Sequence, residues 1–102
     1  MSNQVYTIDE LKLKIGSILS NFPVEKAILF GSYAKNEANK DSDIDLVVDM
    51  TGEADGFKFL EILGLLCDSL RKDVDLIELG DIIKDGKIDN EISRTGVIIY
   101  GK

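Results

Sequence analysis

Histidine is absent from this 102-residue chain, and cysteine occurs once. Without an imidazole, the chain has no histidine for acid–base or nucleophilic catalysis and none to ligate zinc. The single cysteine, Cys67, excludes an internal disulfide, and its place in an apolar helical pattern predicts a buried structural thiol. No apolar run is long enough to span a membrane and no signal peptide is visible, so we expect a cytoplasmic protein.

Positive charge is also scarce. The chain has 12 Lys and Arg against 19 Asp and Glu, a formal net charge of −7. Broad electrostatic binding to DNA or RNA requires cationic side chains that neutralise phosphates, so we expect no direct nucleic-acid binding. An acidic surface suits docking to a basic protein partner instead. The length fits one domain, residues 1–102, with a single core.

The order of helical and strand patterns predicts an α/β (α+β) fold, a small mixed sheet flanked by helices. Thr7 and Glu10 form a capping-box pattern at the start of the first helix. Leu60 is one of several residues that give the second long helix a wide apolar face. The predicted helices span Ile8–Leu19, 33–37, 57–71 and 88–94. The predicted strands span Lys26–Phe30, Ile44–Asp49, 74–79 and 97–100, and composition predicts a loop at 51–56.

Two of these predicted strands adjoin polar residues of chemical interest. The first strand ends at Gly31-Ser32, where glycine allows a close backbone approach and a helix N-terminus favours a phosphate. Asp43 and Asp45, two residues apart at the start of the second strand, project from the same face at about 6–7 Å along the chain. Such a pair can hold Mg²⁺ from one side and leave the other side open to the phosphates of a ligand.

Either half of this pattern is weak alone, because a Gly-Ser is usually a turn and an Asp-x-Asp is usually a solvated strand edge. Together, Gly31-Ser32, ten intervening residues and Asp43-Ile44-Asp45 resemble the signature of the polymerase β-like nucleotidyltransferase superfamily. The flanking residues resemble most its minimal members, the MNT-domain proteins. Lys35 departs from the pattern, since many members carry arginine there. Lysine keeps the charge but lacks the planar fork that binds phosphate in a bidentate way.

The resemblance implies a fold and a set of site residues. The first three strands should lie together, with Asp75 beside Asp43 and Asp45 as the third carboxylate. These three aspartates would be the catalytic residues and would hold one or two Mg²⁺ ions, while Gly31, Ser32 and Lys35 would bind ATP. Two acidic neighbours of Asp75 remain alternatives for the third carboxylate. These alternatives are Asp73 and Glu78.

The resemblance also implies a partner, since MNT proteins often act as antitoxins of HEPN-domain ribonuclease toxins. We therefore predict a Mg-dependent nucleotidyltransferase that moves AMP from ATP, a nucleoside triphosphate, to a HEPN-domain protein. One alternative is a non-catalytic module that neutralises its partner by occupancy. Another is the nucleotide-binding subunit of a small-molecule nucleotidyltransferase.

Overall fold

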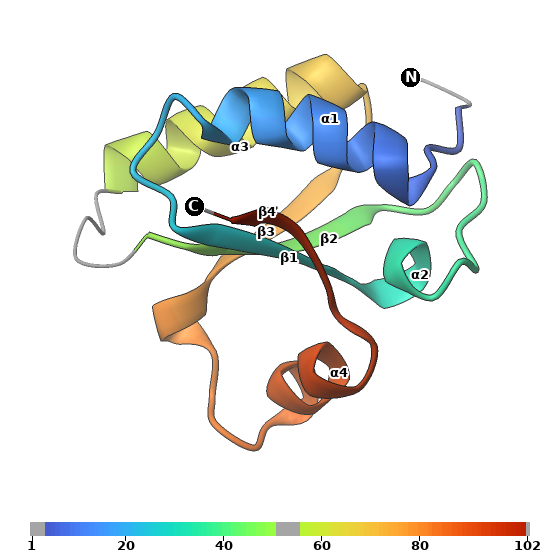
Figure 1. The fold of residues 1–102 in the computed structure, drawn as a ribbon, viewed down its shortest axis with the longest axis vertical. Coiled ribbons are helices and arrows are strands. Elements are labelled where there is room, and N and C mark those ends of the chain that lie inside the picture. Colours follow the sequence, from blue (N-terminus) through green and yellow to red (C-terminus); the bar gives the residue numbers. More distant parts are fainter. Residues whose placement is uncertain (1–3, 51–55, 102) are drawn as a thin grey trace.

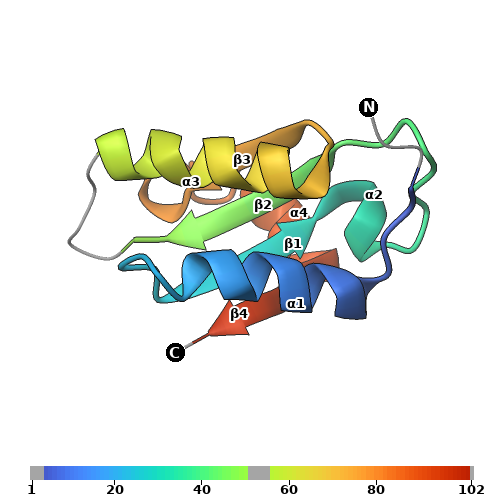
Figure 2. The same cartoon turned by 90° about the horizontal axis from the view of Figure 1, so that it is seen from above.

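A mixed sheet of four strands forms the centre of the molecule, in the order β3-β2-β1-β4 (Figure 1). The computed structural model describes residues 4–50 and 56–101. Figure 2 shows two long helices, α1 and α3, side by side across one face of the sheet, with α4 behind it. The helices are α1 (Ile8–Leu19), α2 (Gly31–Ala34), α3 (Gly56–Leu70) and α4 (Lys87–Thr95), with a 3₁₀ turn at Leu79–Asp81. The strands are β1 (Lys26–Phe30), β2 (Ile44–Asp49), β3 (Val74–Glu78) and β4 (Val97–Gly101).

The N-terminal helix confirms its prediction in both its bounds and its cap. The Thr7 hydroxyl accepts a hydrogen bond from the Glu10 amide at 3.1 Å, and the Thr7 amide donates to the Glu10 carboxylate at 2.8 Å. This reciprocal capping box satisfies two amide groups at the helix start that have no partner within the helix. Buried residues spaced by four positions then fix α1 on the sheet. They are Leu11, Ile15 and Leu19.

Several predicted helix boundaries and burial assignments are wrong in detail. The short helix predicted at residues 33–37 begins at Gly31 and ends at Ala34, because Asn36 adopts a left-handed φ of 62°. Leu60 is 63% exposed, and Ile62 takes the buried position in its place, in step with Leu66 and Leu70.

Further differences concern the second half of the chain. The prediction of a buried thiol is wrong, since Cys67 is only half-buried. Helix α3 ends one residue earlier than predicted because Arg71 adopts a left-handed φ of 55°. Strand β3 also ends one residue early, where Leu79 begins the 3₁₀ turn. The loop predicted at residues 51–56 lies almost wholly outside the described residues.

The strand pairings bring one end of each of three strands to a single edge of the molecule. β1 runs antiparallel to β2, whereas β2 and β3 are parallel. The end of β1 therefore meets the beginnings of both β2 and β3, as predicted for three adjacent strands. Figure 1 shows α2 at this end of the sheet.

The two faces of the sheet differ in how fully they are covered. Residues of one face pack beneath α1 and α3 in the main core; they include Ala27, Leu29, Leu46 and Val48. The alternate residues form a smaller cluster with the apolar side of α4; they are Ile28, Phe30 and Val47, against which Ile88 and Ile92 pack. Since side chains alternate along a strand, Asp45 shares the α4 face with Val47. In the described residues, no helix has the length and apolar character needed to cross a membrane.

Candidate active site

Two aspartates of neighbouring strands lie side by side at the edge where three strands meet. Asp45 of β2 pairs with Asp75 of β3 in the parallel register, and with Phe30 of β1 on its other side. Asp43 precedes β2 by one residue and is exposed. Gly31 follows Phe30 directly, so the Gly-Ser turn adjoins Asp45. The structure thus brings together the groups that the sequence separates by ten to more than forty positions.

Asp45 is the most perturbed carboxyl group of the site. Its pKa is raised to about 6, first by burial and then by the negative charges of Asp75, Asp43 and Glu91, with a further contribution from a side-chain hydrogen bond to Asp75. Burial, the like charges and the hydrogen bond all disfavour the ionised form of Asp45, so the three kinds of cause have the same sign. This electrostatic cost would be removed by a cation bound among the carboxylates.

Gly31 makes the close approach between α2 and Asp45 possible. Its φ is 73°, in the left-handed region that glycine tolerates and other residues rarely adopt. A Cβ atom at this position would collide with the Asp45 carboxylate. The next residues complete the turn. Ser32 is half-buried in the first turn of α2, and Tyr33 is buried in the core and anchors the helix, while Lys35 at its C-terminal end is exposed.

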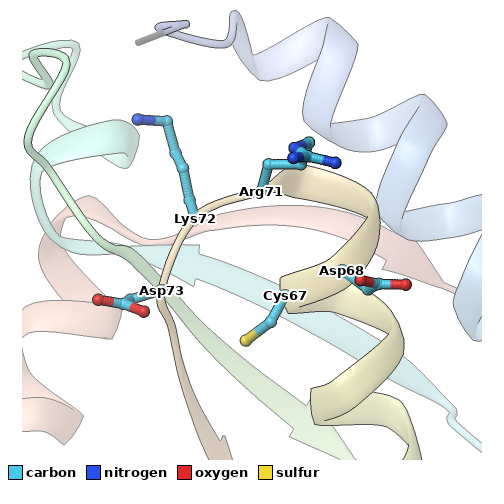
Figure 3. Close-up of a pocket in the computed structure, with 5 residues that line it drawn as sticks. All are labelled: Cys67, Asp68, Arg71, Lys72 and Asp73. Carbon is cyan, nitrogen blue, oxygen red and sulfur yellow. The ribbon is translucent and has the colours of Figure 1, made fainter. Parts of the chain in front are cut away.

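The two alternatives for the third carboxylate lie elsewhere. Glu78 sits at the far end of β3, where its carboxylate accepts hydrogen bonds from the amides of Met50 and Gly80. Asp73 lies before β3 and lines a separate hollow of about 270 Å³ beside Cys67 (Figure 3). Of the three acidic candidates, Asp75 is the one whose charge and hydrogen bond act on Asp45.

The connection between α2 and β2 is contacted by the side chain of a buried lysine, Lys72. Lys72 is 8% exposed, and its Nζ donates a 3.0 Å hydrogen bond to the carbonyl oxygen of Lys40. Figure 3 shows this side chain extending away from Cys67 and Asp68. Within the connection, the Asn39 amide donates to the Ser42 hydroxyl at 2.9 Å. The segment that leads into Asp43 is thus tied both to itself and to Lys72, two residues before β3.

Neither Glu91 nor Lys72 was identified from the sequence. Glu91 lies on α4, and only the packing of this helix against the second face of the sheet brings it near Asp45. In the sequence, Lys72 looks like an ordinary exposed lysine. It is buried because the connection between α2 and β2 lies against it in the fold. No local pattern signals either contact.

The donor set fits a divalent cation that shares its coordination with a ligand. Among residues 4–50 and 56–101, no three His, Cys, Asp or Glu side chains form a ready-made metal cluster. Mg²⁺ commonly takes one or two carboxylates plus substrate phosphates and water, and it does not require a cage built from protein alone. Two crowded carboxylates on adjacent strands, with Asp43 at the edge, match that requirement.

Sequence comparisons identify related proteins. The model of the family described as Polymerase beta, Nucleotidyltransferase matches residues 13–102. A protein of Methanocaldococcus jannaschii, provisionally named a protein adenylyltransferase, is 38% identical over 78 residues. These residues make up 74% of this chain and 81% of the relative.

Solved structures share the fold. A chain in the crystal structure of a toxin–antitoxin with AMP-PNP superimposes with a TM-score of 0.76 at 26% identity, over 89% of this chain and 73% of that one. A second match comes from a complex of the MNT antitoxin with the tri-AMPylated HEPN toxin of Shewanella oneidensis. Its TM-score is 0.71 at 23% identity, over 94% of this chain and 74% of that one, and it shows the fold alone.

Proposed function

Because this chain belongs to the polymerase β nucleotidyltransferase family, we propose that it is a Mg-dependent enzyme that transfers AMP from ATP to a protein partner. The observation that carries the proposal is the position of the Gly31-Ser32 turn against Asp45, which itself pairs with Asp75. A phosphate-binding turn and a set of unneutralised carboxylates at one edge are the two halves of a metal–nucleotide site.

Each residue has a role in this proposal. Asp43, Asp45 and Asp75 would hold Mg²⁺, which when bound neutralises phosphate charge and favours ionisation of the attacking hydroxyl. Gly31 and Ser32 present a backbone amide and a hydroxyl to the phosphates. In the reaction, the hydroxyl oxygen of the acceptor bonds to the α-phosphorus and the bond to pyrophosphate breaks. The hydroxyl proton passes to a carboxylate oxygen of Asp75. Positioning and charge stabilisation supply most of the catalysis.

The proposed acceptor is a HEPN-domain protein, modified on a hydroxyl side chain. Three observations support this choice: the adenylyltransferase name of the archaeal relative, the toxin–antitoxin setting of a structural neighbour with AMP-PNP, and the net charge of −7, which suits a basic partner. We place the reaction in the cytoplasm, where ATP and such a partner are both available.

The test is to incubate the chain with ATP, Mg²⁺ and the purified partner, and to measure the intact mass of the partner. We expect one or more AMP additions at substoichiometric enzyme, and none with the Asp43→Asn plus Asp45→Asn variant. A matched control, Asp9→Asn plus Asp68→Asn, removes the same charge from the helices on the opposite face of the sheet. If this chain neutralises the partner only at equimolar concentration, and the variant without Asp43 and Asp45 does so equally well, the chain is instead a binding module.

A further inference from the structure

A second feature opens on the α4 side of the sheet, between α2 and α4. It is a hollow of about 510 Å³. Lys35 is the one lining residue that also belongs to the nucleotidyltransferase motif. The two helices pack against one another near this point. The lining residues are Lys35, Lys87, Asn90, Glu91, Arg94 and Thr95.

The hollow lies on the same face of the sheet as Asp45. Glu91 lines it from α4, between Ile88 and Ile92 in the sequence, and these two isoleucines pack against the cluster that contains Phe30, the strand residue paired with Asp45. On its other side, Lys35 lies three positions after Ser32 in the α2 segment, so the two side chains lie on the same side of that turn. The hollow therefore lies between the end of the α2 segment, which contributes Lys35, and α4, which contributes the other five lining residues.

The sequence of α4 divides its surface into an apolar and a charged side. Ile88 and Ile92 pack against the small cluster on the sheet. Lys87, Glu91 and Arg94 recur at intervals of four and three positions, which places them in one row along the helix. Packing of the isoleucines therefore fixes the direction in which the row faces, and all three of its members line the hollow.

We propose that this hollow binds the β- and γ-phosphates of the nucleoside triphosphate and the pyrophosphate released from it, with Arg94 and Lys87 as phosphate ligands. The proposal rests on nucleotide binding at the Gly31-Ser32 turn. Three cationic side chains line the hollow together with one carboxylate, that of Glu91. A polyphosphate carries the negative charge that this excess of cations would neutralise.

Arg94 would also supply a group that the motif itself lacks. Lys35 is a point charge on a flexible chain, whereas a guanidinium binds two phosphate oxygens in a fixed fork. When the bond from the α-phosphorus to the bridging oxygen breaks, its electron pair leaves with pyrophosphate. Arg94 and Lys87 lie where that added charge would be neutralised.

The test measures binding of ATP, pyrophosphate and AMP to the full chain by calorimetry, each in the presence of Mg²⁺. We expect Arg94→Gln to weaken ATP and pyrophosphate by about tenfold or more, as for a lost charge-assisted hydrogen bond, and to leave AMP nearly unchanged. Lys87→Gln should act in the same direction, and Arg94→Lys should lose less than Arg94→Gln. Lys84→Gln, a matched control on the exposed segment before α4, does not line the hollow and should bind as wild type.

Three results would overturn the inference: unchanged pyrophosphate binding in Arg94→Gln and Lys87→Gln, equal weakening of AMP, or a wild-type chain that binds ATP but not pyrophosphate. Arg94 and Lys87 are exposed, so thermal unfolding should confirm that both variants fold. The assay needs no acceptor. An Arg94-dependent affinity for pyrophosphate therefore supports the hollow even if no partner is labelled. If the partner is labelled with AMP but pyrophosphate binding does not depend on Arg94, the inference about the hollow fails and the proposed function stands.

Discussion

Asp45 and Asp75 occupy paired positions on the parallel strands β2 and β3, and the charge of Asp75 opposes the ionisation of Asp45. Asp45 is half-buried and Asp75 is exposed, and a fold selected only for stability would avoid this pairing, since a like charge beside a half-buried carboxylate lowers the free energy of unfolding. Strained electrostatics of this kind are typical of functional sites. The same crowding becomes favourable when a cation is shared between the two carboxylates.

The first prediction concerns the pH dependence of stability without metal. The pKa of Asp45 rises from 3.8 to about 6 on folding, so the folded state holds the proton more tightly than the unfolded state. The resulting stabilisation is complete below the unfolded pKa and is lost as the pH rises through the folded pKa. In the presence of chelator, we expect the melting temperature of the wild type to fall by a few degrees between pH 4.5 and pH 7 on account of this group. The melting temperature of the Asp45→Asn variant should fall less over the same range. Equal slopes in both proteins would contradict the assignment.

The second prediction concerns the metal ligands. With nucleotide present, Asp43→Asn and Asp45→Asn should each weaken Mg²⁺ or Mn²⁺ binding by more than the roughly 10–100-fold that loss of an outer-shell partner costs. The reason is that each substitution removes one of few protein ligands. Mn²⁺ titration followed by electron paramagnetic resonance measures this directly. Asp68→Asn on α3 is the control, and wild-type affinity in both site variants would exclude these residues as ligands.

The third prediction separates Asp75 from its neighbour Asp73. Asp75→Asn preserves shape and removes a charge that opposes Asp45, so its melting temperature should equal or exceed that of the wild type. AMP transfer should nevertheless fall by about 10²–10⁴-fold, the usual contribution of a general base. Asp73→Asn, two residues earlier and on a different hollow, should retain transfer. The reverse result in initial-rate measurements would assign the third carboxylate to Asp73.

The sequence predicts best what depends on neighbouring residues. The bounds of α1, β1 and β2 follow from caps, turn formers and short apolar runs, and they agree with the structure. The buried face of α3 was predicted less well: Leu60 was expected on it and Ile62 occupies it. A helix with apolar residues on most sides does not reveal from its sequence which of them pack on the sheet. The pairing of Asp45 with Asp75 requires the strand order, which family resemblance implied and periodicity did not. Glu91 reaches the site through tertiary packing alone.

The last prediction concerns Lys72 as a positioning residue. Lys72 is a buried residue, and its Nζ donates to the carbonyl oxygen of Lys40, three residues before Asp43. Lys72→Met keeps most of the volume and deletes the donor, so the chain should fold, while the segment that leads into Asp43 loses the hydrogen bond between the Lys40 carbonyl and Lys72. A misplaced ligand weakens metal binding and slows transfer even when no reacting group has been changed. We therefore expect about a tenfold or greater loss of both Mn²⁺ affinity and transfer rate, in line with outer-shell substitutions.

The chain offers a matched control for this prediction. Lys40 accepts the hydrogen bond through its backbone carbonyl, so Lys40→Ala removes a cation from the same segment and leaves the contact intact. Lys40→Ala should bind Mn²⁺ as the wild type does, and Lys72→Arg, which keeps a donor, should recover part of the loss. If Lys72→Met and Lys40→Ala bind Mn²⁺ equally well, the hydrogen bond does not position Asp43. If Lys72→Met lowers the melting temperature sharply but leaves metal affinity intact, Lys72 supports the fold and not the site.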